Sequence, residues 1–186
     1  MTVPLIRRPF NTHEYHRMLE AGILNEDDRV ELIDGEIINM PPIGPRHAAC
    51  VDRLAEFLSS KIKKLAIVRI QSPIQLSEYS EPLPDISLLK RRDDFYAHSH
   101  PLPEDVLIAI EVADTTIESD RKVKLPAYAR AGIVEVWLVD LYNDRIEVHT
   151  RPSEGVYQEV RIILRGHKVV SSTVPQLKLK ADDILG

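Results

Sequence analysis

A single α/β domain is the architecture we expect for this chain. Its 186 residues suffice for one domain of ordinary size and are too few for two full domains. Hydrophobic residues make up 44% of the chain and charged residues 28%, the balance of a soluble globular protein. Apolar patterns typical of strands alternate with patterns typical of helices along the whole length. These features exclude the disordered and fibrous classes.

Two helices are expected in the first third of the chain. Residues 12–21 have the pattern of a short capped helix that stops at Gly22. Pro41, Pro42, Gly44 and Pro45 break the preceding strand, and the apolar residues from Ala48 to Leu65 then recur at three- and four-residue spacing. That spacing indicates an amphipathic helix.

A β-hairpin is expected between these helices. The apolar runs 29–33 and 36–40 flank Asp34-Gly35, the dipeptide that best fits a type I′ turn. Strand alternation places Glu31 and Ile33 on the same face of the hairpin. A carboxylate therefore lies on a face that is otherwise apolar.

The middle of the chain is expected to contain short strands and a surface loop. Residues 66–76 suggest two short strands joined or bulged at Pro73. Residues 84–89 follow as another strand, with Asp85 near its beginning. The segment 90–103 is rich in charged residues, histidine and proline, which is typical of a surface loop.

The last part predicts buried strands around one helix. Residues 106–112 are nearly continuous in apolar residues, as in a central strand covered on both faces, and Glu111 interrupts them. Residues 119–131 have helical composition and end at Gly132. The other predicted strands are 134–140, with Trp137 in the core, 145–150 and 156–164.

Charge and cysteine content narrow the class of protein. The net charge of −5 gives no general attraction to a polyanion, so a nucleic-acid surface has to be local. Cys50 is the single cysteine, and nothing indicates an oxidising compartment. We see no signal segment and no apolar run of membrane-spanning length, so we expect a cytoplasmic protein. Basic residues that could contact phosphates cluster at Lys61, Lys63, Lys64 and Arg69, at Lys90–Arg92, and at Arg121-Lys122.

Asp85 and Glu111 are the candidate metal ligands. A carboxylate in a strand that otherwise belongs to the core is costly unless it is paired, hydrogen-bonded or bound to a cation. Two hard oxygen donors on adjacent strands would form part of a Mg²⁺ site, which can activate water next to a phosphodiester. The alternative is structural: Glu111 pairs with a basic residue, and Asp85 caps a turn after Pro84. The histidines show no zinc-like spacing with Cys50, and no nucleophile-elbow motif is present.

The order of motifs resembles a known family. The motifs follow one another along the chain in this order: Pro84-Asp85, the strand containing Glu111, the basic segment Arg121–Lys124, Tyr128–Gly132 and Glu135–Asp140. The likeness extends to Arg29–Glu36, Gly44–His47, Gln71–Gln75 and Ile146–His149. Together these motifs resemble the Uma-type restriction endonucleases, formerly a domain of unknown function, within the PD-(D/E)XK nuclease superfamily.

The resemblance implies a restriction-endonuclease-like fold, in which helices flank a mixed β-sheet and additional β-hairpins are present. It also implies roles for particular residues. Asp85 and Glu111 would bind Mg²⁺ or Mn²⁺. The superfamily pattern has a lysine two residues after the second acid, where this chain has Ala113. The resemblance implies that the following helix supplies the lysine; Lys124 matches best, with Lys122 as the fallback. Further residues that match motif positions and could support the cleft are Glu31, His47 and Gln71.

We therefore expect a divalent-metal-dependent endonuclease that hydrolyses DNA phosphodiester bonds. Cutting both strands of a duplex usually requires two sites, so we expect a homodimer, with part of the contact from the apolar residues of 156–164. One alternative is a nucleic-acid-binding or assembly module without turnover, which Ala113 and the acidic charge suggest. Another is a hydrolase that acts on a different phosphorylated substrate.

Overall fold

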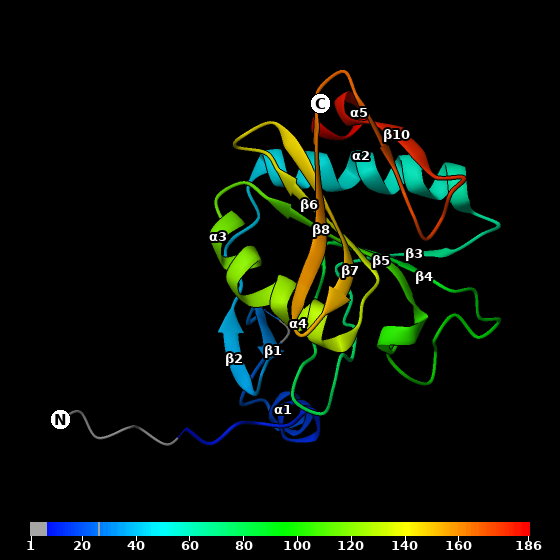
Figure 1. The fold of residues 1–186 in the computed structure, drawn as a ribbon. Coiled ribbons are helices and arrows are strands. Elements are labelled where there is room, and N and C mark those ends of the chain that lie inside the picture. Colours follow the sequence, from blue (N-terminus) through cyan, green and yellow to red (C-terminus); the bar gives the residue numbers. More distant parts are fainter. Residues whose placement is uncertain (1–6, 26) are drawn as a thin grey trace.

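A six-stranded mixed sheet forms the centre of the molecule, as the computed structural model of residues 7–25 and 27–186 shows (Figure 1). The strands lie in the order β3-β4-β5-β6-β7-β8; β5 and β6 are parallel, and the other neighbours are antiparallel. They are β3 (Ile67–Ile70), β4 (Ile86–Leu89), β5 (Val106–Ala113), β6 (Glu135–Asp140), β7 (Arg145–Ser153) and β8 (Val156–Leu164). The expected mixed sheet flanked by helices is confirmed.

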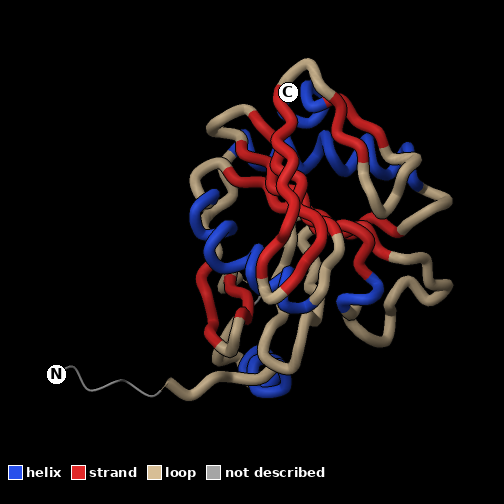
Figure 2. Tube along the Cα trace, in the orientation of Figure 1, coloured by secondary structure: helices blue, strands red, loops and turns tan. Residues whose placement is uncertain are grey.

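One face of the sheet is covered by α2 (Pro45–Ile62), α5 (Ala181–Leu185) and the hairpin of β9 (Lys168–Val170) and β10 (Lys178–Lys180) (Figures 1 and 2). Pro45 begins α2, where its missing N–H would have no helical partner anyway. The helix buries a stripe that includes Leu54 and Leu58 against the strand residues around Trp137. The helix ends at Ile62. Leu65, which we had expected to belong to the helix, lies beyond its end and is exposed.

The N-terminal hairpin lies on the opposite face. β1 (Val30–Ile33) pairs with β2 (Glu36–Asn39), and the turn residues Asp34 and Gly35 have φ angles of 52° and 77°, as a type I′ turn requires. Helix α1 (Thr12–Glu20) packs on this hairpin through a small apolar cluster of Tyr15, Val30 and Leu32. Asn11 caps α1 in a capping box with Glu14.

The connection between β5 and β6 is not the single helix 119–131 that its composition predicts. It consists of α3 (Ile117–Ser119), the π-turn η2 (Asp120–Lys124) and α4 (Leu125–Ala131), which ends at Gly132 with a φ of 81°. Pro126 has no N–H to donate, which breaks the α-helical ladder at this point. Leu125 N–H donates to the carbonyl of Asp120 five residues earlier, so the chain forms a π-turn ahead of the proline.

Two further expectations differ from the structure. The second strand expected within residues 66–76 is absent, because Gln71 has a φ of 43° and the next backbone groups bond within loops: Ile74 N–H donates to the carbonyl of Pro82, and Leu76 N–H to that of Ser80. The loop 90–103 leads into a short 3-10 turn, η1 (Pro103–Asp105). Among the described helices, none has both the length and the apolar character needed to cross a bilayer.

Candidate active site

A cleft of about 210 Å³ opens between the β1–β2 hairpin, the start of α2, the end of β5 and the β5–β6 connection. Its walls carry five acidic side chains and two basic ones. The acids are Glu31, Asp85, Glu111, Asp114 and Asp120, and the bases are Arg29 and Lys124. The cleft therefore has an excess of negative charge that favours a cation.

Strand register places the two predicted metal ligands side by side. Because Ile86 on β4 pairs with Ile110 on β5, Asp85 lies opposite Glu111. The N–H of Val112 donates to Oδ2 of Asp85 at 2.8 Å, which fixes that carboxylate next to the strand that carries Glu111.

Asp85 is held by two further side chains. His47 Nε2 lies 2.9 Å from Oδ2 of Asp85, and the Gln71 amide donates to Oδ1 at 3.4 Å. Burial raises the pKa of Asp85, but the hydrogen bond and charge of His47 and the Val112 N–H together lower the pKa below its usual value. Asp85 is thus a carboxylate with its Oδ1 only weakly engaged.

Lys124 reaches the same acids from the π-turn. Its Nζ lies 3.2 Å from Oε2 of Glu31 and 3.3 Å from Oε2 of Glu111, with only 12% of the side chain exposed. Burial lowers the pKa of Lys124, but the surrounding carboxylates, Glu111 foremost and then Glu31, raise it above its usual value. The ammonium therefore remains charged in the cleft.

Tyr128 orients Glu111. Its hydroxyl donates to Oε1 of Glu111 at 2.6 Å, and Lys124 stands one helical turn earlier on the same face. Burial raises the pKa of Glu111 well above its usual value, and the Lys124 charge counters part of that effect. Ala113 is fully buried in the apolar cluster that also contains Tyr128, so no cation approaches from the strand position itself.

Two other acids complete the site. Glu31 accepts the backbone N–H of Leu83 at 3.1 Å in addition to its contact with Lys124. Asp120 accepts the hydroxyl of Thr116 at 2.8 Å, and burial raises its pKa. Sequence reasoning overlooked Asp120; the available signal was its position four residues before Lys124, on the same helical face.

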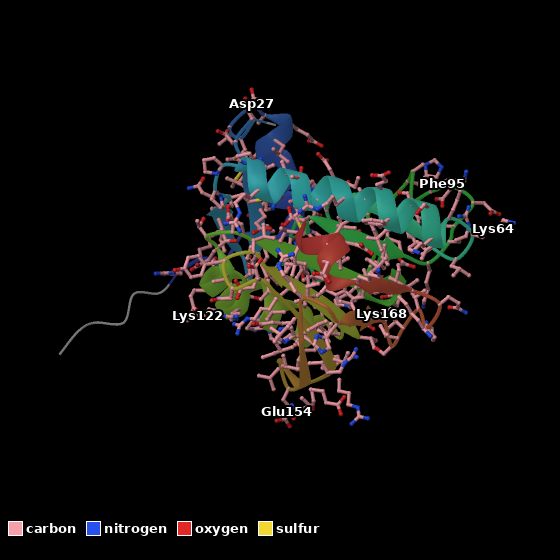
Figure 3. The ribbon with its side chains drawn as sticks, turned by 90° about the horizontal axis from the view of Figure 1, so that it is seen from above. Asp27, Lys64, Phe95, Lys122, Glu154 and Lys168 are labelled. Carbon is pink, nitrogen blue, oxygen red and sulfur yellow. The ribbon has the colours of Figure 1, made fainter. Side chains whose placement is uncertain are left out.

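The basic clusters lie elsewhere. Lys122 is 74% exposed and pairs with Glu118 at 3.1 Å, so it does not line the cleft as the fallback assignment would require. Arg121 is bound to Glu147 and to Asp140. Lys64 and Lys122 are found on opposite sides of the molecule (Figure 3), and no residue of the three clusters lines the described cleft.

The donor set fits a hard divalent cation. Mg²⁺ and Mn²⁺ prefer carboxylate oxygens, and the cleft provides Asp85 from the bend just before β4 and Glu111 from β5; the strand expected over 84–89 begins one residue after Asp85. The surplus of acids over bases supplies the charge that such an ion would neutralise.

Comparison with known proteins agrees with the fold. The Uma2 family, described as "Putative restriction endonuclease", matches residues 12–182. A solved structure of a "putative nuclease belonging to DUF820" from Anabaena variabilis ATCC 29413 has 19% sequence identity and a TM-score of 0.75. The match covers 95% of this chain and 98% of that one. No curated protein matches the chain.

Proposed function

The chain belongs to the Uma2 family of restriction-endonuclease-like proteins, and on that premise we propose that it hydrolyses DNA phosphodiester bonds with the help of Mg²⁺ or Mn²⁺. The observation that carries the proposal is the contact of Lys124 Nζ with Glu111 at 3.3 Å. It brings a buried cation to the second acid although Ala113 occupies the usual lysine position. The cleft thus contains the two carboxylates proposed to bind the metal and one ammonium in contact with the second of them.

Each residue has a distinct part in this mechanism. Asp85 and Glu111 would hold the ion, which would acidify water and neutralise phosphate charge. Lys124 stabilises the negative charge that develops on the phosphate in the transition state. Tyr128 is a positioning residue, because its hydroxyl holds Glu111. His47 and Gln71 hold Asp85, and Glu31 holds Lys124.

Metal-dependent cleavage tests this proposal directly. Wild type should cut a labelled DNA duplex in Mg²⁺ or Mn²⁺ and stop in excess EDTA. Asp85→Asn and Glu111→Gln should each lose at least about a hundredfold in single-turnover rate while retaining the wild-type circular dichroism spectrum. Wild type that binds duplex DNA without cutting it in either ion would instead identify a binding module. Cleavage of RNA or small phosphodiesters but not DNA would change the substrate class.

We also propose a homodimer built on β8. This strand lies at the edge of the sheet, and Val156, Val160, Ile162 and Leu164 are each about half exposed. An exposed apolar edge strand readily pairs with another strand. A two-fold pair would supply the two sites needed to cut both strands of a duplex.

A further inference from the structure

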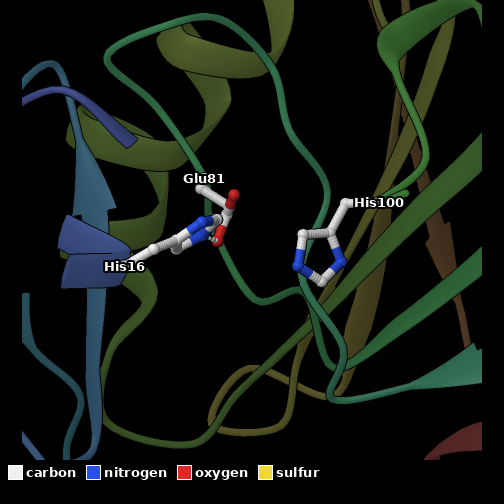
Figure 4. Close-up of side chains that lie close together, drawn as sticks. All are labelled: His16, Glu81 and His100. Atoms are coloured by element: carbon white, nitrogen blue, oxygen red, sulfur yellow. Dashed lines mark hydrogen bonds and ion pairs between the residues drawn. The ribbon is translucent and has the colours of Figure 1, made fainter. Parts of the chain in front are cut away.

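Three side chains from distant parts of the sequence meet outside the cleft. His16 comes from α1, Glu81 from the segment between β3 and β4, and His100 from the loop before η1 (Figure 4). One ligand atom from each lies within 4.8 Å of the other two. Nε2 of His16 is 2.8 Å from Oε1 of Glu81, and the two imidazole rings are 6.0 Å apart between centroids.

Glu81 has a buried carboxylate oxygen that accepts no hydrogen bond from any described residue. The residue is only 2% exposed, and this oxygen is its Oε2. A buried carboxylate oxygen without a partner is costly. A cation next to Oε2 would remove that cost.

The three ligands favour a transition metal over Mg²⁺. Imidazole nitrogen suits Zn²⁺ and its neighbours, whereas Mg²⁺ prefers oxygen ligands throughout. Bonds of about 2.1 Å in tetrahedral geometry place the ligand atoms of one Zn²⁺ about 3.4 Å apart. The ligand atoms lie within 4.8 Å of one another, so each pair would have to change its separation by at most about 1.4 Å to reach that value. Three protein ligands leave the fourth position to water.

We propose that His16, Glu81 and His100 bind one divalent transition-metal ion, with Zn²⁺ as the representative, independently of the nuclease cleft. The ion fastens α1 and the loop 90–103 to the body of the protein. Among the residues that the structure describes, the buried apolar side chain of α1 belongs to the small cluster with the β1–β2 hairpin and not to either of the two large cores. Glu81 is anchored to β1 because its N–H donates to the carbonyl of Leu32 at 2.7 Å.

Direct metal binding tests the proposal. The full chain, stripped with a chelator, is dialysed against micromolar Zn²⁺ in excess Mg²⁺, which occupies oxygen-donor sites. We expect one Zn²⁺ per chain in wild type and in the Asp85→Asn/Glu111→Gln double variant. His16→Ala and His100→Ala should each weaken binding by more than about tenfold. The controls are His13→Ala and His98→Ala, which replace exposed histidines two or three residues from the ligands.

Stability and spectroscopy provide further readouts. At a hundredfold excess over the wild-type dissociation constant, Zn²⁺ should raise the wild-type Tm by about 5–10 °C and the Tm of His100→Ala by at most about half as much. Co²⁺ should produce visible absorption bands that both ligand variants lose. The proposal is overturned if wild type binds no Zn²⁺, or if binding survives in both ligand variants. Loss of Zn²⁺ only in the double variant would place the ion in the nuclease cleft and also reject the proposal. Because Zn²⁺ binding is measured without DNA, a failed cleavage assay does not affect this test.

Discussion

Replacing Lys124 by Met tests how the cleft balances its charges. The substitution keeps an unbranched side chain one atom shorter than lysine and removes the ammonium between Glu31 and Glu111. At an effective dielectric constant of about 20, each contact of about 3.3 Å represents about 5 kcal/mol of attraction. Burying the charged groups costs several kcal/mol per ion, which offsets much of this gain. Removing one partner, however, leaves uncompensated buried charge, and such changes typically cost about 3–5 kcal/mol.

Thermal unfolding measures this cost. Without divalent ions, Lys124→Met should lower the Tm by about 10 °C. The matched control is Lys122→Met, two residues away, whose exposed ion pair with Glu118 contributes little. Mg²⁺ should raise the Tm of Lys124→Met more than that of wild type, because a bound cation replaces the missing positive charge. Equal Tm values for the two lysine variants in EDTA would refute the charge balance described above.

Catalysis gives a second measurement on the same variants. Lys124→Met should lose about a hundred- to thousandfold in single-turnover cleavage at saturating Mg²⁺ and still bind DNA. Lys122→Met should show at most a modest, salt-sensitive loss. A severe defect in Lys122→Met with a nearly normal Lys124→Met would reverse the assignment.

Three other predictions concern stability and assembly. Buried Glu135 accepts hydrogen bonds from Trp137 Nε1 at 2.6 Å and from Ser172 N–H at 2.8 Å. Glu135→Ala should therefore lower the free energy of unfolding, measured in urea, by about 3–5 kcal/mol. The control Glu104→Ala, at an exposed position, should leave it unchanged. Burial raises the pKa of Glu147, but its bonds with His149 and Arg121 lower the pKa to about 2, below the usual 4.5. Its stabilisation is therefore complete above about pH 4.5 and lost as the pH falls toward 2, and Glu147→Gln should remove that part of the acid dependence. Ile162→Lys should convert a dimer to a monomer in light scattering at tens of micromolar; a monomeric wild type would remove the dimer proposal.

Local chemistry explains what could be predicted from the sequence. The Asp34-Gly35 turn depends on backbone angles that these residues adopt readily, so the hairpin was found. The cost of burying charge singled out Asp85 and Glu111, and the structure places Asp85, the residue before β4, opposite Glu111 on β5. For Lys124, the resemblance pointed to a lysine supplied by the following helix, and the structure shows its contact with Glu111.

Contacts between distant segments explain what was missed. The apolar residues of 72–76 suggest a strand, but their backbone groups bond to the turn around Ser80 and Pro82. The role of Tyr128 depends on a hydroxyl contact 17 residues away in sequence. The cluster of His16 with His100 has no signature in their spacing, because Glu81 joins them only in the folded chain.

The parallel pairing of β5 and β6 bears on how such a site evolves. Parallel neighbours cannot be joined by a tight turn, so the chain has to cross over between them. That crossover leaves β5 just after Glu111 and carries Lys124 back over the same acid. A lysine lost from the strand is therefore replaceable from the crossover by one substitution, with no change in topology. A motif search that demands lysine two residues after the acid would pass over such proteins.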